Sequence, residues 1–481
     1  MKFTLSWLKD HLETNASAAE IGEKLTAIGL ELEELKDPSK ALAPFKVAYV
    51  VEAVQHPNAD KLRVLKVDTG AGVLQVVCGA PNARTGMKGV FAPVGTYVPG
   101  TDLLLKATKI RGVDSNGMMC SSRELMLGDD HDGIIDLPAD APIGAPALSV
   151  LKVDPVFDIS ITPNRPDCLG VYGIARDLAA AGLGKLKHGD ARQGVAAIKG
   201  DYSCPIPIGL EFTPGTEDAC PVFAGRLVRK VKNGPSPAWL QERLKAIGLR
   251  PISALVDITN YISFDRGRPL HVYDAKKLRS RIFARLGHAG EKLVALDGKT
   301  YDITPEMCVI ADEGGAIGLG GVMGGESTGC TETTTEVLIE SAYFDPLRTA
   351  KTGRALGIES DARYRFERGV DPAFVEPGLD LATEMIMDLC GGEPSQPLVA
   401  GKPPMDRLAL DFNPSEIKRL TGVELPPTET TRILTALGFE PKPNGAKLAL
   451  KAPTWRPDID GNADIVEEVV RIHGLDNVPS T

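Results

Sequence analysis

Short apolar runs alternate with turns of glycine, proline and asparagine between residues 40 and 150. Gln55-His56-Pro57-Asn58 and Cys78-Gly79-Ala80-Pro81-Asn82 are two of these turns. The runs around them are rich in valine and leucine and cover residues 47–54, 62–67 and 73–77. Strands of this length, separated by turns at this spacing, are typical of a small closed β-barrel. The pattern therefore predicts a barrel domain over 40–150.

A helix ending and a loop motif each occur twice in the chain. Ser17-Ala18-Ala19-Glu20 is a capping box that opens a helix, and Gly29 stands where that helix should end. The matching pairs are 25–31 with 434–440, and 164–167 with 455–458. Both pairs together predict a small α+β domain that is present in two copies.

The first copy is interrupted by the barrel, since its two halves lie on either side of it in the sequence. Insertion at an exposed turn is tolerated when the ends of the inserted domain lie close together. A central domain is expected to hold β-like segments at 221–231, 281–285, 308–311 and 337–340 and helices at 236–247 and 373–390. The predicted fold class is therefore multidomain α+β. Its parts are the first half of the small domain (1–39), the barrel (40–150), the second half (151–190), a Gly/Pro-rich linker (191–215), the central domain (216–392) and the second small domain (402–478).

Composition places the chain among globular proteins of the cytoplasm. It has 481 residues, of which 43% are hydrophobic and 25% charged, and no apolar run is long enough to span a membrane. Eight scattered cysteines without a CxxC pair predict neither a zinc site nor a disulfide framework. The net charge of −10 argues against indiscriminate binding to nucleic acid.

Basic residues nevertheless gather in the barrel segment. Between residues 46 and 123, ten Lys and Arg stand against five Asp and Glu, and Lys109 and Arg111 are among them. A barrel with a positive face is a common way to hold an RNA backbone. The alternative is a barrel that binds protein, or nothing.

Three polar clusters interrupt apolar segments of the central domain. They contain Thr259 and Asn260, then His271, then the glycine-dense stretch 318–325, which Glu340 follows. Glycines permit close approach of a ligand to the backbone, whose amides can donate hydrogen bonds. Taken singly, each cluster has an ordinary structural explanation: a hydrogen-bonded histidine, a turn and a carboxylate at a strand end.

Four carboxylates gather near the end of the chain. Asp464, Glu467 and Glu468 stand at i, i+3 and i+4, so they share a helix face, and Asp458 lies at the approach to that helix. Converging carboxylates repel one another, and a hard divalent cation would relieve the repulsion. A solvated acidic first turn, favoured by the helix dipole, explains the same residues. The residues alone leave both explanations open.

The barrel motifs and the domain order resemble one known family. The segments 55–62, 78–82, 109–113 and 117–121 resemble the tRNA-binding OB-fold module of several proteins associated with tRNA synthetases. From end to end, the chain resembles the N-terminal half or more of the beta subunits of bacterial-type phenylalanyl-tRNA synthetase. The resemblance implies an OB-fold barrel, an editing domain of B3/B4 type at 216–392 and a magnesium-binding domain of B5 type at 402–478.

The resemblance also implies a function. In that family the central domain hydrolyses mischarged tyrosyl-tRNA, and the subunit binds phenylalanine-specific tRNA. It supports a catalytic alpha subunit, which carries ATP and phenylalanine, in a heterotetramer of two alpha and two beta subunits. By position, the editing pocket comprises Thr259, Asn260, His271, Gly320, Gly321, Gly324 and Glu340. The magnesium ligands, shared with the alpha subunit, comprise Asp458, Asp464, Glu467 and Glu468.

An editing site of this kind has a physical reason. An apolar site for phenylalanine rejects the isostere with an added hydroxyl by only ~100-fold. A second site must then recognise the hydroxyl, and a buried carboxylate such as Glu340 is a suitable acceptor. Thr259, Asn260 and His271 would hold the terminal ribose, the ester carbonyl and a water. Some members carry alanine where this chain has Gly320, which changes the pocket volume slightly.

Two other functions fit parts of the chain. One is a tRNA-binding scaffold without editing activity, and the other is a DNA-binding protein that uses the small domains, which acidic helices such as 464–468 disfavour. We expect no aminoacylation site in this chain, because class I nucleotide signatures are absent and Tyr364-Arg365-Phe366-Glu367 lacks its accompanying class II elements. Family members continue beyond residue 481 into a catalytic-like and an anticodon-binding domain.

Overall fold

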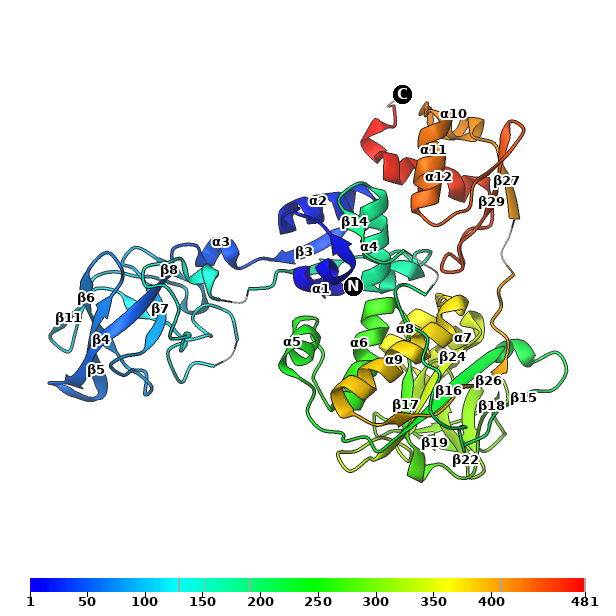
Figure 1. Ribbon diagram of the computed structural model, residues 1–481, viewed down its shortest axis with the longest axis horizontal. Coiled ribbons are helices and arrows are strands. Elements are labelled where there is room, and N and C mark those ends of the chain that lie inside the picture. The colour runs from blue at the N-terminus through cyan, green and yellow to red at the C-terminus, as the bar shows by residue number, and fades with distance from the viewer. Residues whose placement is uncertain (129, 152, 190–191, 407–408, 480–481) are drawn as a thin grey trace. The chain divides into compact units, whose positions relative to one another are not determined.

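The computed structural model describes residues 1–128, 130–151, 153–189, 192–406 and 409–479 (Figure 1). The chain forms two compact units, of which one is Lys36–Pro155 and the other combines Met1–Leu35 with Val156–Thr481. Both units contain helices and strands, so the prediction of a multidomain α+β protein is confirmed. Within the described part of the chain, no helix has the length and apolar character that a membrane crossing needs.

The unit Lys36–Pro155 is built on a five-stranded sheet in the order β12-β7-β4-β5-β6. The three predicted apolar runs form β4, β5 and β6. Val47 packs into one hydrophobic cluster and Ala48 and Val50 into another, so both faces of β4 are covered. The elements are α3 (Ser39–Leu42), β4 (Lys46–His56), β5 (Ala59–Asp68), β6 (Val73–Cys78), β7 (Lys88–Ala92), β8 (Tyr97–Val98), β9 (Leu103–Leu104), β10 (Thr108–Ile110), β11 (Val113–Ser115) and β12 (Met118–Met119).

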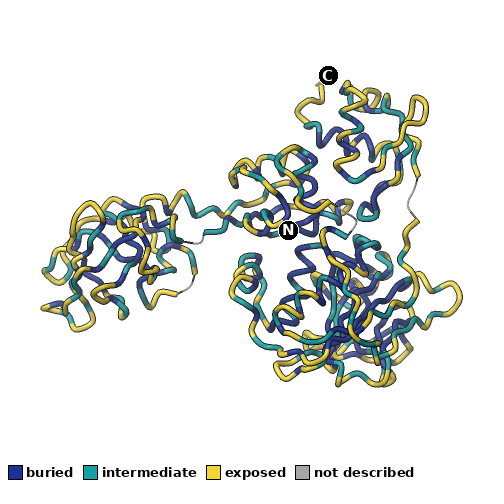
Figure 2. The backbone as a smooth tube through the Cα atoms, viewed as in Figure 1, coloured by how far each residue is buried: buried dark blue, intermediate teal, exposed yellow. Residues whose placement is uncertain are grey.

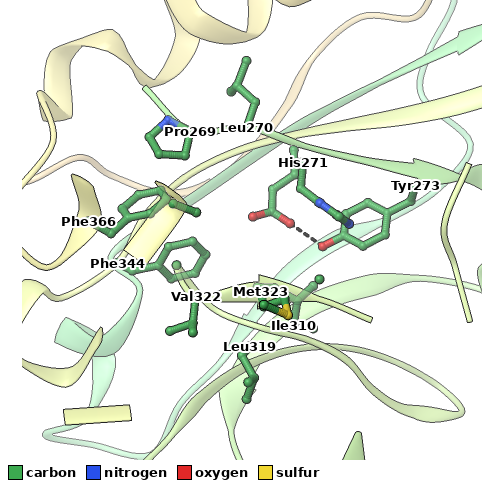
Figure 3. Close-up of a pocket in the computed structure, with 15 residues that line it drawn as sticks. Pro269, Leu270, His271, Tyr273, Ile310, Leu319, Val322, Met323, Phe344 and Phe366 are labelled. Atoms are coloured by element: carbon green, nitrogen blue, oxygen red, sulfur yellow. Dashed lines mark hydrogen bonds between the residues drawn. The ribbon is translucent and has the colours of Figure 1, made fainter. Parts of the chain in front are cut away.

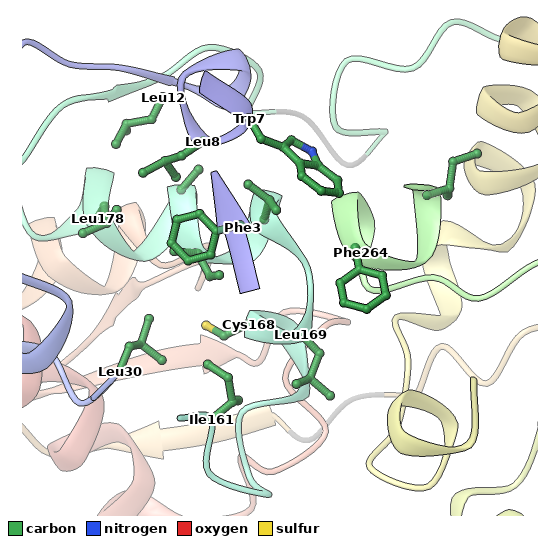
Figure 4. Close-up of a cluster of buried hydrophobic side chains, with 14 of the residues drawn as sticks. Phe3, Trp7, Leu8, Leu12, Leu30, Ile161, Cys168, Leu169, Leu178 and Phe264 are labelled. Atoms are coloured by element: carbon green, nitrogen blue, oxygen red, sulfur yellow. The ribbon is translucent and has the colours of Figure 1, made fainter. Parts of the chain in front are cut away.

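The first small domain is assembled from two separate stretches of the chain. Its sheet has the order β1-β13-β3, so a strand from beyond residue 155 lies between two strands from the first forty residues. Figure 4 shows the core that closes around this sheet, with Phe3, Leu8 and Leu178 among its side chains. The elements are β1 (Lys2–Thr4), α1 (Leu5–His11), β2 (Leu12–Glu13), α2 (Ala18–Ala27), β3 (Leu32–Lys36), β13 (Val156–Ile159), α4 (Val171–Ala180) and β14 (Lys185–Leu186).

The predicted start and end of helix α2 are confirmed. Ser17 and Glu20 bond reciprocally as a capping box, and Gly29 follows with φ +87°. The amide of Leu30 then donates to the carbonyl of Leu25 at 2.9 Å, which closes the last turn. Gly438 and Gly248 end their helices in the same way, with φ of +88° and +90°. The ending is therefore a common cap, which by itself is weak evidence for a repeat.

The central domain contains two five-stranded sheets, a small two-stranded sheet of β19 and β20, and a layer of helices (Figure 1). Figure 2 shows buried backbone concentrated inside this domain and exposed backbone in its outer loops. One sheet has the order β17-β24-β16-β25, with β26 also on β16, and the other has the order β15-β18-β21-β22-β23. Ile339 of β24 packs with α6 and α9, whereas Leu338 packs with the second sheet. The first sheet is therefore buried on both faces.

The strands and helices expected in the central domain are confirmed, with ends shifted by a few residues. Segment 191–215, expected as a linker, differs, because its last part pairs parallel with β18 and extends the second sheet. The elements are β15 (Ile208–Glu211), β16 (Val222–Arg229), α5 (Ala238–Ala246), α6 (Ala254–Arg266), β17 (His271–Asp274), β18 (Ile282–Leu286), β19 (Lys292–Val294), β20 (Thr300–Asp302), β21 (Cys308–Asp312), β22 (Gly315–Leu319), β23 (Met323–Gly324), β24 (Glu336–Tyr343), α7 (Pro346–Leu356), α8 (Asp361–Phe366), α9 (Val375–Cys390), β25 (Glu393–Pro394) and β26 (Leu398–Gly401).

The second small domain repeats the sheet-and-helix plan of the first. Its three-stranded sheet has the order β27-β29-β28, and helices α10 and α11 pack against α12. The elements are β27 (Ala409–Phe412), α10 (Ser415–Thr421), α11 (Pro427–Ala436), β28 (Lys442–Asn444), β29 (Lys447–Lys451) and α12 (Asn462–His473).

A buried arginine binds two carboxylates in each small domain, at the same spacing in the sequence. Arg165 donates to both oxygens of Asp167 at 3.0 Å and to Asp177 at 2.8 Å. Arg456 donates to both oxygens of Asp458, at 2.8 and 2.7 Å, and to Glu468. The two sets have the same sequence spacing, so the repeated Arg-Pro-Asp motif forms the same contacts in each copy. A duplicated domain is expected to keep such a contact.

Candidate functional site

The register of two central strands gathers polar side chains on one face of the first sheet. β17 pairs antiparallel with β24, and His271 lies directly opposite Glu340. Because side chains alternate along a strand, Tyr273 shares the face of His271. The glycine-dense segment around β22 and β23 approaches this face, and a cavity of about 60 Å³ lies between them (Figure 3). Its wall also contains Pro269, Leu270, Ile310, Val322, Met323, Phe344 and Phe366.

The carboxyl of Glu340 is buried, and no charged side chain of the described residues pairs with it. Its side chain accepts a hydrogen bond from the Tyr273 hydroxyl at Oε2, drawn as a dashed line in Figure 3. Burial raises the pKa of Glu340 to about 7, and the Tyr273 bond opposes that rise. A carboxyl with this pKa changes its charge near neutral pH, as groups in functional sites often do.

His271 is a neutral imidazole beside this carboxyl. Burial lowers the pKa of His271 to about 4. Its ring meets the Tyr273 ring edge to face, with centroids 4.5 Å apart. The ring nitrogen Nε2 has no hydrogen-bond partner within the described part of the chain. A buried polar atom without a partner costs free energy, so this nitrogen is available to a ligand or a water.

The glycines around the cavity are required by neighbouring side chains. A Cβ at Gly324 would lie 2.4 Å from Cε1 of His271, so only glycine leaves the imidazole in place. A Cβ at Gly320 would lie 2.8 Å from the Phe344 ring, and one at Gly321, whose φ is +71°, would lie 3.1 Å from it. Alanine at position 320 would therefore press on an aromatic wall of the cavity.

The structure brings together only part of the predicted pocket. His271, Gly321, Gly324 and Glu340 line the cavity, and Gly320 packs directly behind it. Thr259 and Asn260 do not line it. They lie on α6, which covers the opposite face of the sheet.

The Thr259 hydroxyl is bonded within α6, since Oγ1 donates to the backbone carbonyl of Val256 at 2.8 Å.

Reasoning from sequence missed the cavity residue Tyr273. The signal was present, because a residue two positions beyond His271 on a strand must face the same way.

The carboxylates at the end of the chain are bound by arginines. Both oxygens of Asp458 accept from Arg456, and Glu468 accepts from Arg456 and from Arg471. Burial alone would raise the pKa of Glu468, but the charges of Arg471 and Arg456 outweigh it and hold that pKa well below its ordinary value. These two side chains are therefore neutralised ion pairs.

The other two carboxylates point elsewhere. Asp464 accepts from the amides of Gly461 and Asp460, at 2.8 and 3.0 Å, and so caps the start of α12. Glu467 is exposed. Contrary to the expectation from spacing, the four carboxylates do not converge. The arrangement therefore does not fit a magnesium site built from all four, because guanidinium groups hold the oxygens of Asp458 and Glu468 and one oxygen of Asp464 caps α12.

One of these arginines links the two small domains. Arg471 of α12 donates to Asp177 of α4 at 2.8 Å, and Asp177 also pairs with Arg165. Within the described ranges, the one group of His, Cys, Asp or Glu close enough to share a metal is Asp167, Cys168 and Asp177. Both of its carboxylates already pair with Arg165. The cluster is therefore an ion-pair network between domains.

The basic residues Lys109 and Arg111 lie on an exposed hairpin of the unit Lys36–Pro155. Strands β10 and β11 are joined by Arg111 and Gly112, both with positive φ, as in a type I′ turn. The side-chain amide Nδ2 of Asn58 donates to the carbonyl of Arg111 at 3.1 Å, and Nε2 of His56 donates to the carbonyl of Ile110 at 3.1 Å. The β4–β5 turn therefore fixes the hairpin that presents these two cations.

Three family models match separate segments of the chain. They are described as a tRNA binding domain (residues 45–146), a B3/4 domain (residues 219–391) and a tRNA synthetase B5 domain (residues 410–475). The B3/4 match contains the cavity. The B5 match contains the arginine-bound carboxylates.

The chain is also similar to curated proteins over its full length. Phenylalanine–tRNA ligase beta subunits of Mesorhizobium japonicum and Bradyrhizobium diazoefficiens are 59% and 57% identical over 99% and 100% of this chain. The chain spans 59% of the length of each relative. A solved N-terminal fragment of the phenylalanyl-tRNA synthetase beta subunit of Pyrococcus horikoshii is 16% identical, with a TM-score of 0.34 over 66% of this chain and 87% of that one.

The ion pairs of Glu468 predict that removing its charge destabilises the protein. Glu468→Gln should destabilise the unit that contains it by on the order of 3 kcal/mol, because two buried arginines lose a charged partner. The exposed Glu467→Gln is the matched control and should change stability by less than about 0.5 kcal/mol. Urea unfolding followed by tryptophan fluorescence measures both, since Trp7, Trp239 and Trp455 all lie in this unit.

Millimolar magnesium should leave the urea midpoint of the wild-type chain unchanged. A ligand that binds only the folded state would raise it by mass action. A rise in the wild type that disappears in the Glu467→Gln, Glu468→Gln double variant would show that the carboxylates bind the ion after all.

Proposed function

Since the chain belongs to the family of phenylalanine–tRNA ligase beta subunits, we propose that it binds tRNA and hydrolyses mischarged tyrosyl-tRNA. Hydrolysis takes place in the cavity of the central domain. The observation that carries this proposal is the buried carboxyl of Glu340, which faces a cavity with aromatic walls. Such a carboxylate accepts a hydrogen bond from the phenolic hydroxyl that distinguishes tyrosine from phenylalanine.

The cavity has to widen to admit an aromatic side chain. Its volume of about 60 Å³ is smaller than the ~150 Å³ that holds a benzene molecule in an engineered protein cavity. Met323 lies in the wall, and its unbranched side chain adapts easily to a changed shape. Phe344 and Phe366 meet edge to face, with centroids 5.1 Å apart, and supply aromatic surface for the entering ring.

Hydrolysis requires a water near the ester. With its pKa of about 4, His271 is a weak base at neutral pH and is better suited to orient a water than to remove its proton. Its unpaired Nε2 supports this role. Thr259 and Asn260, which lie on the other face of the sheet, have no part in this mechanism as the structure stands. Substrate groups then have to help position the water.

The unit Lys36–Pro155 is the proposed tRNA-binding part, with an OB-fold arrangement of its strands. The match to a tRNA binding domain over residues 45–146 supports this. So does the braced hairpin with Lys109 and Arg111, since cations on an exposed element attract a phosphate backbone.

Aminoacylation itself is proposed to belong to a partner. An alpha subunit would bind ATP and phenylalanine, and this chain would support it. The alternative function is a tRNA-binding scaffold without editing activity. Deacylation assays with tyrosyl-tRNA and phenylalanyl-tRNA, both on phenylalanine-specific tRNA, separate the two, because a scaffold hydrolyses neither ester above background.

Glu340→Ala is expected to abolish the preference for the tyrosyl ester. The pocket loses the acceptor for the phenolic hydroxyl, which corresponds to about 1–3 kcal/mol of discrimination. Glu336→Ala is the control, since Glu336 lies on the same strand but outside the cavity. Rates of deacylation of both esters measure the ratio. An unchanged ratio in Glu340→Ala would remove this carboxyl from the recognition site.

The double variant Lys109→Glu, Arg111→Glu is expected to weaken tRNA binding and to flatten its salt dependence. The slope of log K against log salt falls with each phosphate contact that is lost. Lys442→Glu, Lys447→Glu has the same change in net charge on exposed residues of the other unit and serves as the control. Filter binding over a range of salt concentrations gives the slopes. Equal slopes for wild type and the hairpin variant would mean that these cations do not contact tRNA.

A further inference from the structure

Tyr273 has an unusual position in the candidate site. It lies in the cavity wall, is 1% exposed, and carries the same phenolic group that the proposed substrate would bring. Its hydroxyl donates to Oε2 of Glu340. Within the described residues, no group donates to the other oxygen, Oε1. This oxygen is not completely enclosed by protein atoms. One carboxylate oxygen is therefore occupied by the protein, and the other is open to the cavity.

We propose that Tyr273 is a positioning residue that sets the specificity of the site: its hydroxyl holds one oxygen of Glu340 and thereby presents the other, as an ionised acceptor, to the phenolic hydroxyl of the ligand. This proposal rests on the proposed editing function and names the residue that makes Glu340 selective. The bond fixes the carboxylate plane, so that Oε1 faces the cavity. It also favours the charged form, since a hydrogen bond to a carboxylate stabilises its negative charge.

The charge of Glu340 depends on this bond because, among the described residues, only the Tyr273 hydroxyl offsets the effect of burial. The titratable groups that face it are His271 and Tyr273 on β17, Cys308 on β21 and Cys220 just before β16. Burial lowers the pKa of His271 to about 4 and raises that of Cys308 to about 12. Burial also raises the pKa of Cys220 and of Tyr273 well above their ordinary values. Between pH 6 and 8.5, only Glu340 in this group changes its charge.

The sign of the pH effect follows from this. The ionised form accepts the substrate hydroxyl, so the preference for the tyrosyl ester should rise as the pH rises through about 7, the pKa of Glu340. Loss of the Tyr273 hydroxyl removes the interaction that lowers this pKa. The preference for the tyrosyl ester should then rise only at a higher pH. For a shift of one unit, the ionised fraction at pH 7 falls about fivefold.

The test compares Tyr273→Phe with Tyr301→Phe. Tyr301 donates to Asp297 at 2.7 Å outside the cavity, so its variant also loses a tyrosine–carboxylate bond. Deacylation of tyrosyl-tRNA and phenylalanyl-tRNA is measured from pH 6 to 8.5, with the spontaneous rate subtracted. We expect Tyr273→Phe to lose about fivefold in selectivity at pH 7 and to regain it at higher pH, whereas Tyr301→Phe behaves as wild type. Unchanged or increased selectivity of Tyr273→Phe at pH 7 overturns the proposal.

A second measurement does not depend on activity. With glutamate labelled by ¹³C at the side-chain carboxyl, the resonance that is absent from Glu340→Gln reports the ionisation of Glu340. Its midpoint should move to higher pH in Tyr273→Phe and stay in place in Tyr301→Phe. If the titration midpoint of Glu340 does not move in Tyr273→Phe, the role of Tyr273 is overturned even when the chain hydrolyses tyrosyl-tRNA. If the midpoint moves but the chain hydrolyses neither ester, only the editing function is refuted.

Discussion

The pairing of Arg471 with Asp177 and Glu468 is the contact on which the arrangement of the larger unit depends. Both carboxylates and the arginine are buried, and they come from the two small domains, which are far apart in the sequence. A buried charge without a partner is costly, so each of these residues requires the others. The network therefore favours the docking that keeps these charges paired, because another docking would leave a buried charge without its partner.

A second constraint, the strand register, builds the candidate site. His271 can meet Glu340 only because β17 and β24 pair antiparallel at that position, and a slip by one residue would turn one of them to the helical face. The same face needs glycine at 324, where a Cβ would displace the imidazole. The site thus depends on backbone geometry more than on the chemistry of any single side chain.

Local patterns in the sequence predicted the local structure well. The capping box at Ser17 and the strands of the central domain follow from short-range propensities, and the structure confirms them. The acidic cluster was different, because the same carboxylates can repel one another or pair with arginines, and spacing alone does not say which. Arg471 lies one turn from Glu468 on α12, whereas Arg456 reaches Glu468 only once α12 has packed beside the loop that precedes it. Thr259 and Asn260, which the resemblance assigns to the editing pocket, show the same limit, since position in the sequence does not determine which face of a sheet a helix covers.

Two buried glutamates in this chain show how the surroundings decide between a structural and a functional carboxyl. Glu468 is held by two arginines, its pKa is low, and it stays charged over the whole physiological range. Within the described residues, Glu340 accepts a hydrogen bond only from a hydroxyl, the imidazole beside it is neutral, and no arginine or lysine lies within ion-pair distance. Burial therefore raises its pKa to about 7. A fold selected for stability alone gains nothing from such a group, because an apolar side chain would fill the same space at lower cost. A buried carboxyl with no basic side chain of the described residues to pair with is thus the strongest physical reason to expect that this face of the sheet binds a ligand.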